Sequence, residues 1–504
     1  MAEKQMKKLA KETAMYGVSS ILGRFLNWMM FPLYSFVLSG PAAYGVITNL
    51  YAWTALLLVA LTYGMETGFL RFANKNIEQS DKVYSTTLIS VGFTSLLFAL
   101  CCIFFSQSIA NVLGASNQSS MGYSSHPEYI ALMGSTVALD AFGCIPYVYL
   151  RFKSRPIRFV FLNLFGIAVN IFFNIFFLVV CPWLVVKAPN LINWFYNPDY
   201  GVGYVFISNF ISSALVTVAL LFDVFVVKFT FDKVLLKQML KYSLPLVVLG
   251  IAGIMNQTLD KILFPYLMHG NNEASELGIY GGIAKIALIM TMFTQAFRYS
   301  YEPFIFAQKK DKNSLETYAD AMKYYILIAL LIFLGMMLYM DIFKHIISYK
   351  YWVGLKVVPI IMFSFIFQGI FFNLSLWYKL TDKTMYGAWF SILGTIIMVL
   401  LNIVLVPTYS YMGCAWAAFA CFFVIMVVSY FFGQKYMPIK YDFKTIGLYT
   451  LVTIVLFFIS TFIHTPHAVV NVGLKSVLMI GYLVLLVKRD FPLRTIPVIN
   501  RFFK

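Results

Sequence analysis

The chain has 504 residues, of which 61% are hydrophobic and only 12% charged, and its mean hydropathy is +0.79. This composition excludes an ordinary soluble globular protein and predicts a polytopic membrane protein. The formal net charge of +17 lies in short basic segments between apolar runs, so it indicates orientation in a membrane and no nucleic-acid partner.

The first apolar run, Ala14 to Leu38, is long enough to cross a bilayer and carries Arg24 near its middle. A charge at that depth costs about 2.5–3.5 kcal/mol on insertion scales, so it needs a partner or a cavity. Helical spacing places Arg24 on one polar and aromatic stripe with Ser20, Asn27, Phe31 and Tyr34. We therefore expect Arg24 to face a substrate path, with a structural salt bridge as the alternative.

About fourteen apolar runs of membrane-spanning length follow one another along the chain. They start near Ala14, Tyr44, Tyr84, Tyr129, Phe159, Gly203, Tyr242, Gly278, Asp320, Val353, Tyr386, Met412, Lys444 and Asn471. An even number of spans places both termini on one side. The distribution of Lys and Arg predicts that this side is the cytoplasm, with the chain in a bacterial inner membrane.

The sequence also repeats itself weakly. FPLY at 31–34 returns as FPYL at 264–267, AYGV at 43–46 returns as IYGG at 279–282, and longer matches pair 62–69 with 298–305 and 150–174 with 378–402. A direct repeat of about six spans predicts an all-α protein with two six-helix lobes, related by a pseudo-two-fold axis along the membrane normal. The predicted lobes are residues 1–236 and 237–440, and residues 441–504 form two additional helices and a cytoplasmic tail.

The ionisable residues well inside the apolar zone are Arg24, Glu66, Asp140, Asp223, Asp260, Lys261, Lys285, Arg298, Glu302 and Lys475. Seven of these ten lie in the first, second, seventh and eighth spans, which the repeat relates. The predicted substrate-binding set is Arg24, Asn27, Lys285, Gln295 and Arg298. The alternative is that Asp260 pairs with Lys285, or Glu302 with Arg298, to join helices, while Lys261 and Lys475 only extend to an interface.

Four carboxylates are predicted to couple transport to a cation or to gate the path, namely Glu66, Asp140, Asp260 and Glu302. A carboxylate within the membrane can exchange a proton or bind Na⁺, so either ion is left open as the coupling ion. Replacing either Glu66 or Glu302 by Gln is expected to slow transport.

The sequence does not favour an enzyme. All five histidines lie at outer loops or outer ends, and only His464 and His467 have even weak metal-ligand spacing. No phosphate-binding loop, nucleophile elbow or dinucleotide fingerprint is found. The six cysteines lie in or beside apolar runs, so neither a disulfide framework nor a thiolate metal site is expected. No catalytic residue, metal or further cofactor is predicted.

The stretch GVSSILGRFLNWMMFPLYSFVLSGPAAYGVITNLYAWTALLLVALTYGMETGFLRF, with IAKIALIMTMFTQAFRYSYEPFIFAQ in the eighth span, resembles the polysaccharide-transporter branch of the multidrug/oligosaccharidyl-lipid/polysaccharide (MOP) exporter superfamily. O-antigen, capsule-unit and lipid II flippases are related. The resemblance implies a central cationic cavity for the pyrophosphate and sugars of a polyprenyl-linked oligosaccharide. It places Arg24 at a first-span arginine and Lys285 and Arg298 at eighth-span cations. Phe25 replaces the acidic neighbour common in lipid II flippases.

The resemblance thus implies a flippase that moves an undecaprenyl-pyrophosphate-linked oligosaccharide from the inner to the outer leaflet by alternating access. The alternatives are a lipid II flippase and a cation-coupled multidrug exporter of the same superfamily. A membrane glycosyltransferase or polysaccharide polymerase is a third class, disfavoured by the repeat and by the short outer loops. Expected partners are the lipid-linked oligosaccharide and the bilayer. The polymerase and glycosyltransferases of the same pathway are left open as further partners.

Overall fold

The computed structural model describes residues 2–114, 121–268, 272–307, 314–463 and 467–490, and this part of the chain contains helices and no strand. The helices of the first half are α1 (Ala2–Val37), α2 (Pro41–Thr62), α3 (Met65–Lys75), α4 (Ser80–Phe104), α5 (Ser106–Leu113), α6 (Glu128–Phe152), α7 (Pro156–Ile175), α8 (Cys181–Lys187), α9 (Pro189–Ile192) and α10 (Gly203–Val224). Those of the second half are α11 (Lys233–Leu267), α12 (Glu273–Ala307), α13 (Ser314–Leu338), α14 (Met340–Phe343), α15 (Val358–Leu374), α16 (Leu376–Leu380), α17 (Met385–Tyr409), α18 (Tyr411–Tyr436), α19 (Phe443–Phe462) and α20 (Ala468–Arg489).

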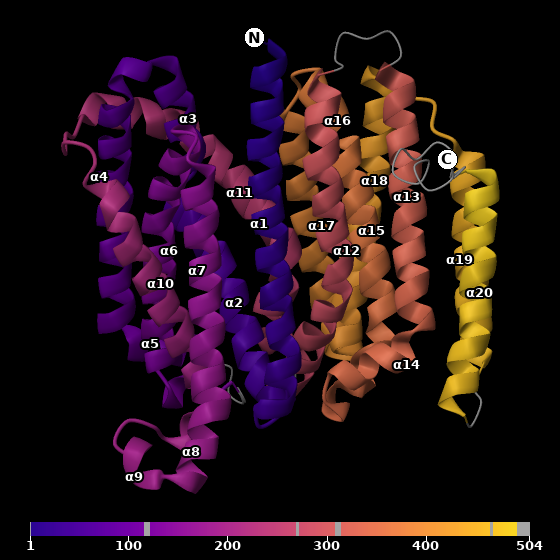
Figure 1. Ribbon diagram of the computed structural model, residues 1–504, viewed down its shortest axis with the longest axis horizontal. Helices are drawn as coiled ribbons and strands as arrows, with labels where there is room; N and C mark the ends of the chain where they lie inside the picture. The colour runs from indigo at the N-terminus through magenta and orange to yellow at the C-terminus, as the bar shows by residue number, and fades with distance from the viewer. Residues whose placement is uncertain (1, 115–120, 269–271, 308–313, 464–466, 491–504) are drawn as a thin grey trace.

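The long helices run side by side in two groups (Figure 1). Helices α3 to α7 and α10 form the N-terminal lobe, and α13 to α18 lie on the opposite side. Helices α1, α2, α11 and α12 lie between the two groups, whereas α19 and α20 stand at the outer edge of the second. The predicted two-lobed helical architecture, with two additional C-terminal helices, is confirmed.

Thirteen helical segments within the described residues are long and apolar enough to cross a membrane. Helix α1, with 36 residues, contains the predicted first span but is not among these thirteen, so a fourteenth span remains a prediction. Helices α1 and α11 begin well before their apolar runs, because a helix continues beyond the bilayer where its polar residues are solvated. The predicted boundary at 236/237 falls inside α11, so the division into domains at that point remains a prediction.

Local sequence signals explain where several helices begin. Helix α7 starts at Pro156, whose missing N–H is not needed in the first turn. Asp232 caps α11 by accepting hydrogen bonds from the amides of Val234 and Leu235, and Asp442 caps α19 by accepting one from Thr445. These caps supply partners for amides that would otherwise have none.

The second span is broken between α2 and α3. Tyr63 and Gly64 both have left-handed backbone conformations, with φ of 33° and 69°. A side chain at Gly64 would meet the backbone oxygen of Ser243 on α11 at 3.1 Å, so glycine allows α3 to pack closely on that helix. The break therefore redirects α3, the second part of this span, against α11.

Helices α2 and α12 cross closely near their first turns. A Cβ atom at Gly45 would overlap the carbonyl of Ala274, and one at Gly278 would overlap the carbonyl of Pro41. A Cβ atom at Gly281 would overlap the side chain of Thr48. The internal repeat pairs Gly45 with Gly281, so equivalent glycines of the two halves each contact the other helix. Small residues at this crossing bring the lobes together at what the predicted topology makes the outer side.

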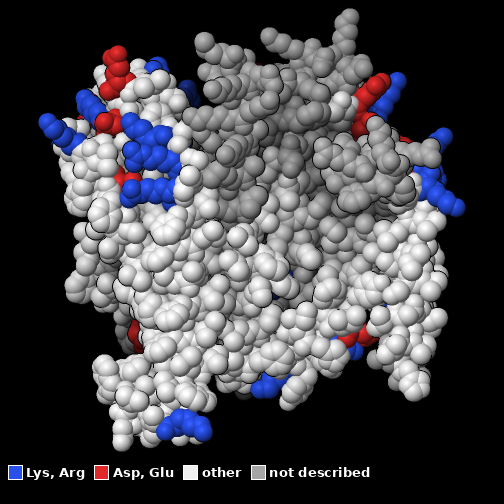
Figure 2. Space-filling model, viewed as in Figure 1, with Lys and Arg blue, Asp and Glu red and all other residues white. Residues whose placement is uncertain are grey.

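Charged side chains gather toward the two ends of the molecule and leave a largely uncharged band between them (Figure 2). The band suits a lipid environment. At the end of α10, Asp223 is 1% exposed and forms an ion pair with Arg158 at 2.9 Å. This pair joins α10 to α7 and explains one of the ionisable residues in the apolar zone as structural.

The additional helix α20 is tied to the second lobe by an ion pair. Lys475, whose side chain is only 8% exposed, donates a hydrogen bond of 2.7 Å to Asp341 on α14, so its predicted role as a residue extending to an interface is wrong. Lys344 donates a second hydrogen bond of 3.0 Å to the same carboxylate. These two bonds, from Lys475 above all, hold the pKa of Asp341 below its ordinary value.

We expect Asp341→Asn to loosen α20 by about 1 kcal/mol, because Lys475 loses its counter-charge while solvent screens part of the effect. Amide hydrogen exchange over residues 468–489 in nanodiscs should accelerate about fivefold at pH 7. In wild type the same acceleration should appear only as the pH falls through the lowered pKa, since a depressed carboxyl pKa stabilises above about pH 4 and fails below it. Asp320→Asn, which breaks an exposed pair with Lys323, is the control. Unchanged exchange in Asp341→Asn would show that the pair does not hold α20.

Candidate functional site

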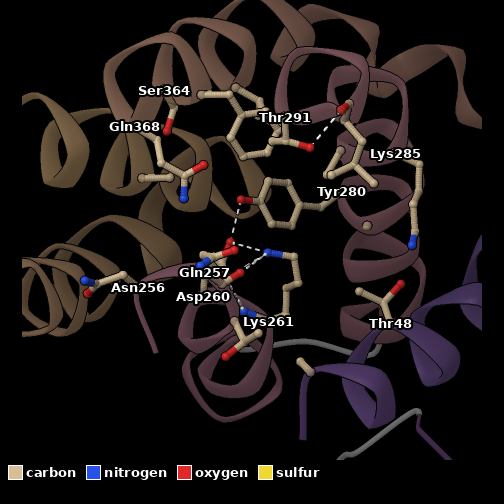
Figure 3. Close-up of a pocket in the computed structure, with 18 of the residues that line it drawn as sticks. Thr48, Asn256, Gln257, Asp260, Lys261, Tyr280, Lys285, Thr291, Ser364 and Gln368 are labelled. Atoms are coloured by element: carbon tan, nitrogen blue, oxygen red, sulfur yellow. Dashed lines mark hydrogen bonds and ion pairs between the residues drawn. The ribbon is translucent and has the colours of Figure 1, made fainter. Parts of the chain in front are cut away.

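A cavity of about 430 Å³ lies where the two lobes meet. Its wall is built from α1 and α2 together with α11, α12, α15 and α18. Charged and polar side chains line much of it, namely Arg24, Thr48, Tyr51, Asn256, Gln257, Asp260, Lys261, Tyr280, Lys285, Thr291, Thr294, Gln295, Arg298, Ser364 and Gln368. Figure 3 shows several of these residues, with Thr48 on α2, Asp260 and Lys261 on α11, Tyr280 and Lys285 on α12, and Ser364 and Gln368 on α15. A polar cavity inside a membrane protein of this composition is a candidate binding site for a polar group.

The cavity is cationic. Four basic residues, Arg24, Lys261, Lys285 and Arg298, line it, and among the described residues of its wall Asp260 is the one acidic residue. The formal excess is therefore three positive charges, from four cations and one carboxylate. In a low-dielectric setting such an excess attracts an anion strongly.

Arg24 and Lys285 bring their charges to the cavity without a carboxylate. Within the described part of the chain, no acidic side chain forms an ion pair with either residue. The backbone carbonyl of Lys285 accepts a hydrogen bond of 2.7 Å from the indole of Trp28, which fixes α1 against α12. Among the described side chains, the salt-bridge alternative for Arg24 therefore finds no partner, and the charges of Arg24 and Lys285 both line the cavity.

Gln295 and Arg298 lie further along the same helix. The guanidinium of Arg298 sits 4.7 Å from the ring centre of Phe372 on α15, a cation–π contact. The side-chain oxygen of Gln295 is buried and has no hydrogen-bond partner among the described residues. An unpaired buried oxygen costs free energy that a ligand hydroxyl would recover. The guanidinium of Arg298 suits an anionic group of a ligand, and the side-chain oxygen of Gln295 suits a ligand hydroxyl.

Asp260 is bound to its chain neighbour. Both carboxylate oxygens accept hydrogen bonds of 2.9 Å from the ammonium of Lys261, and one accepts a bond of 2.6 Å from the hydroxyl of Tyr280 (Figure 3). The predicted pairing of Asp260 with Lys285 is wrong because Lys261 folds back and occupies the carboxylate instead. Lys261 does not extend to an interface as expected but lines the cavity.

Four residues of the predicted binding set line one cavity together with Asp260, namely Arg24, Lys285, Gln295 and Arg298. The remaining residue of that set, Asn27, is exposed and lies outside the lining. The predicted stripe on α1 fails at this point since the helix touches several neighbours along its length. Phe31 packs on Tyr44 and Tyr351, and Tyr34 donates a hydrogen bond to Asn174 of α7. The side chain of Ser20 lies outside the described residues.

Among the predicted coupling carboxylates only Asp260 lines the cavity. Glu66 forms a half-exposed ion pair with Arg151 at 3.3 Å, and Asp140 accepts a hydrogen bond of 2.7 Å from Ser213 within the N-terminal lobe. The side chain of Glu302 lies outside the described residues, so its predicted pairing with Arg298 stays a prediction. The coupling roles of Glu66 and Asp140 also remain predictions.

Sequence reasoning missed several polar residues of the wall. Gln368 and Ser364 lie on α15, and Asn256 and Gln257 on α11. Asn256 is held in place because its oxygen accepts a hydrogen bond of 3.0 Å from Thr395 of α17. The helical spacing of Asn256 with Asp260 could have indicated a common face.

A chain of hydrogen bonds supports the wall from within the N-terminal lobe. Tyr51, which lines the cavity, accepts a hydrogen bond of 2.7 Å from Asn209 on α10. Asn209 accepts one from Asn170, which in turn bonds to Asn174, the partner of Tyr34. Buried polar groups satisfied in this way fix the positions of α1 and α2 relative to α7 and α10. No group of three or more potential metal ligands lies within the described residues.

Comparison with known proteins extends this description. No protein-family model matches the chain, and no curated protein is significantly similar to it. Solved structures do match. The lipid II flippase MurJ in an inward closed conformation is 14% identical with a TM-score of 0.73, over 94% of this chain and 99% of that chain.

Two structures of a multidrug resistance MATE family transporter of the MOP superfamily, in different conformations, also match at 14% identity. The inward-facing one has a TM-score of 0.64 over 85% of this chain and 96% of that one, and the outward-facing one has 0.55 over 84% and 95%. This chain has the fold of the MOP superfamily. Its helices superpose better on the inward-facing structure than on the outward-facing one.

Proposed function

We propose that this chain is a flippase for an undecaprenyl-pyrophosphate-linked oligosaccharide, a unit of a surface polysaccharide such as O-antigen or capsule. The observation that carries the proposal is the excess of cations over carboxylates in the cavity. A pyrophosphate has several oxygens for Arg24 to hold in a bidentate way, with Lys285 supplying a second charge. The polar wall offers hydrogen bonds to sugar hydroxyls.

The sign of the charge that lines the cavity favours a flippase for an anionic lipid over a multidrug exporter. A drug cation needs a carboxylate in its site, and the acidic group of this wall, Asp260, is already neutralised by Lys261. Bringing a further cation beside Arg24 and Lys285 would be repulsive. An anionic headgroup is the better ligand.

A second cavity, of about 380 Å³, supports a long apolar tail on the substrate. It lies between α13, α15, α18 and α19, and its lining is almost wholly hydrophobic, including Leu330, Phe367 and Phe431. Helix α19 closes one side of this groove, which gives the additional helices a role. The groove can shelter a polyprenyl chain while the headgroup occupies the cationic cavity.

We place the protein in the bacterial inner membrane with both termini in the cytoplasm, from the charge distribution described above. Transport proceeds by alternating access, with the headgroup entering from the inner leaflet and leaving to the outer one. A proton or Na⁺ is the candidate coupling ion. A polysaccharide polymerase and glycosyltransferases of the same pathway are candidate partners. Lipid II is the alternative substrate, and Phe25 beside Arg24 favours the surface-polysaccharide unit.

The test is a comparison of ligands on the purified protein in nanodiscs by native mass spectrometry or fluorescence titration. Undecaprenyl pyrophosphate should bind at least about tenfold more tightly than undecaprenol, a difference of about 1.4 kcal/mol. The cationic dye ethidium should not compete. Equal binding of the pyrophosphate and the alcohol, or displacement by ethidium, would contradict the proposal.

A further inference from the structure

The ammonium of Lys261 is held by groups of its own helix. It donates hydrogen bonds of 2.9 Å to both carboxylate oxygens of Asp260 and one of 3.0 Å to the carbonyl of Gln257, so its three protons are used. Neighbouring residues on a helix do not ordinarily face each other. Lys261 must therefore bend back to reach Asp260, and its side chain remains 21% exposed.

Asp260 is more deeply enclosed than its partner. Its side chain is 3% exposed, and the hydroxyl of Tyr280 donates a 2.6 Å hydrogen bond to it. The other titratable groups nearby are Lys285 on α12 and Cys414 and Cys421 on α18. Helix α2 contributes Tyr44 and Tyr51 to the same wall, and α17 has no charged residue in its sequence.

We propose that, in the empty site, the Asp260 carboxylate binds Lys261 in the place that the substrate's phosphate takes when the ligand is bound. When the ligand binds Lys261, a monovalent cation replaces Lys261 as the counter-charge of Asp260. When the anionic headgroup enters, Lys261 turns from Asp260 to the phosphate oxygens. A buried carboxylate without a counter-charge is costly, so Asp260 then takes up a proton or Na⁺ while Tyr280 keeps its hydrogen bond. This inference rests on the proposed function and names its coupling site.

The exchange has two consequences. Ligand and cation bind with positive linkage, each increasing the affinity of the other. Once the cation leaves, Asp260 can again form its ion pair with Lys261, which weakens the binding of the headgroup. The positive charge of the cavity therefore does not prevent release of the headgroup. Within the described chain, no carboxylate competes with the ligand for Arg24 and Lys285. These two residues therefore bind the headgroup both before and after the cation leaves.

The test uses titration calorimetry of undecaprenyl pyrophosphate into the full chain in nanodiscs. It is repeated in buffers of different ionisation enthalpy, with and without Na⁺. For wild type we expect uptake of about one proton, or a Na⁺ dependence of about one ion, per ligand. The two arms distinguish the two cations. Asp260→Asn keeps the shape of the side chain and an oxygen that accepts the hydrogen bond of Tyr280. This variant should abolish the cation uptake. It should also tighten ligand binding about tenfold, because Lys261 has no carboxylate partner before the ligand binds.

Asp320→Asn is the matched comparison, since it removes a carboxylate that pairs with Lys323 outside the cavity lining. It should keep the cation uptake of wild type. The inference is overturned if binding takes up no cation, if Asp260→Asn keeps the uptake, or if Asp320→Asn removes it. Failure of undecaprenyl pyrophosphate to bind wild type at all would instead overturn the proposed function.

Discussion

Replacing Gly45 by Ala is expected to cut flipping at least about tenfold, because the lobes can no longer close at the crossing of α2 and α12. The added methyl group would overlap the backbone of Ala274, which cannot move aside as a flexible side chain can. Overpacking of this kind costs about 1–3 kcal/mol. The cost falls on the state in which α2 and α12 touch, so the variant should favour a state with the cavity open to the outside.

This shift can be measured separately from transport. A cysteine at Ala284, which lines the cavity, is introduced into a chain lacking the native cysteines. A membrane-impermeant thiol reagent added outside should label it faster when Gly45→Ala is also present. Gly253→Ala is the control, because nothing lies within 4 Å of the added atom. Slow flipping with unchanged labelling would show that Gly45 matters for folding and not for closure.

The fold was predictable because the bilayer limits what a chain of this composition can do. A run of about 20 apolar residues has to cross as a helix, so the starts of the spans other than those of α1 and α11 could be placed within about one or two turns. The starts of α1 and α11 were not predictable by the same means. Hydropathy detects the part of a helix that lies in lipid, whereas Ala2 and Lys233 begin polar turns beyond it.

The cationic cavity was also partly predictable. Arg24, Lys285 and Arg298 are too costly to face lipid, which leaves the lobe interface as their location, and the structure places all three there. Helical periodicity failed for Asn27 because it shows which residues share a face but not which neighbour each part of that face touches. The pairing of Asp260 with Lys261 was missed because it depends on a bent side chain and not on helical spacing.

Arg24 is where the largest loss of function is expected. Its guanidinium has no carboxylate partner in the described chain, so its cost in the membrane is not offset until an anion binds. Arg24→Ala removes both the charge and the planar donors, and Arg24→Lys keeps only the charge. A charge-assisted pair is worth about 1.5–3 kcal/mol, which corresponds to a loss of about tenfold to a hundredfold for Arg24→Ala.

The membrane potential contributes to the direction of transport in this account. Moving two negative charges outward across an inside-negative potential is favourable by about 4.6 kcal/mol per 100 mV. Uptake of one cation with the ligand at Asp260 would reduce the moved charge and this driving force by about half. Arg24 should change the rate of flipping without changing its dependence on voltage, since Arg24 remains with the protein.

The most direct test of the central claim, that an anionic lipid-linked headgroup crosses through this cavity, is the rate at which reconstituted vesicles flip an undecaprenyl-pyrophosphate-linked oligosaccharide. Wild type, Arg24→Lys and Arg24→Ala are compared at equal insertion, with Asn27→Ala as a control on the same helix outside the cavity lining. The account predicts normal flipping by the control, impaired flipping by Arg24→Lys and the greatest loss in Arg24→Ala. If folded Arg24→Ala flips the substrate as fast as wild type, the cavity is not the path of the headgroup.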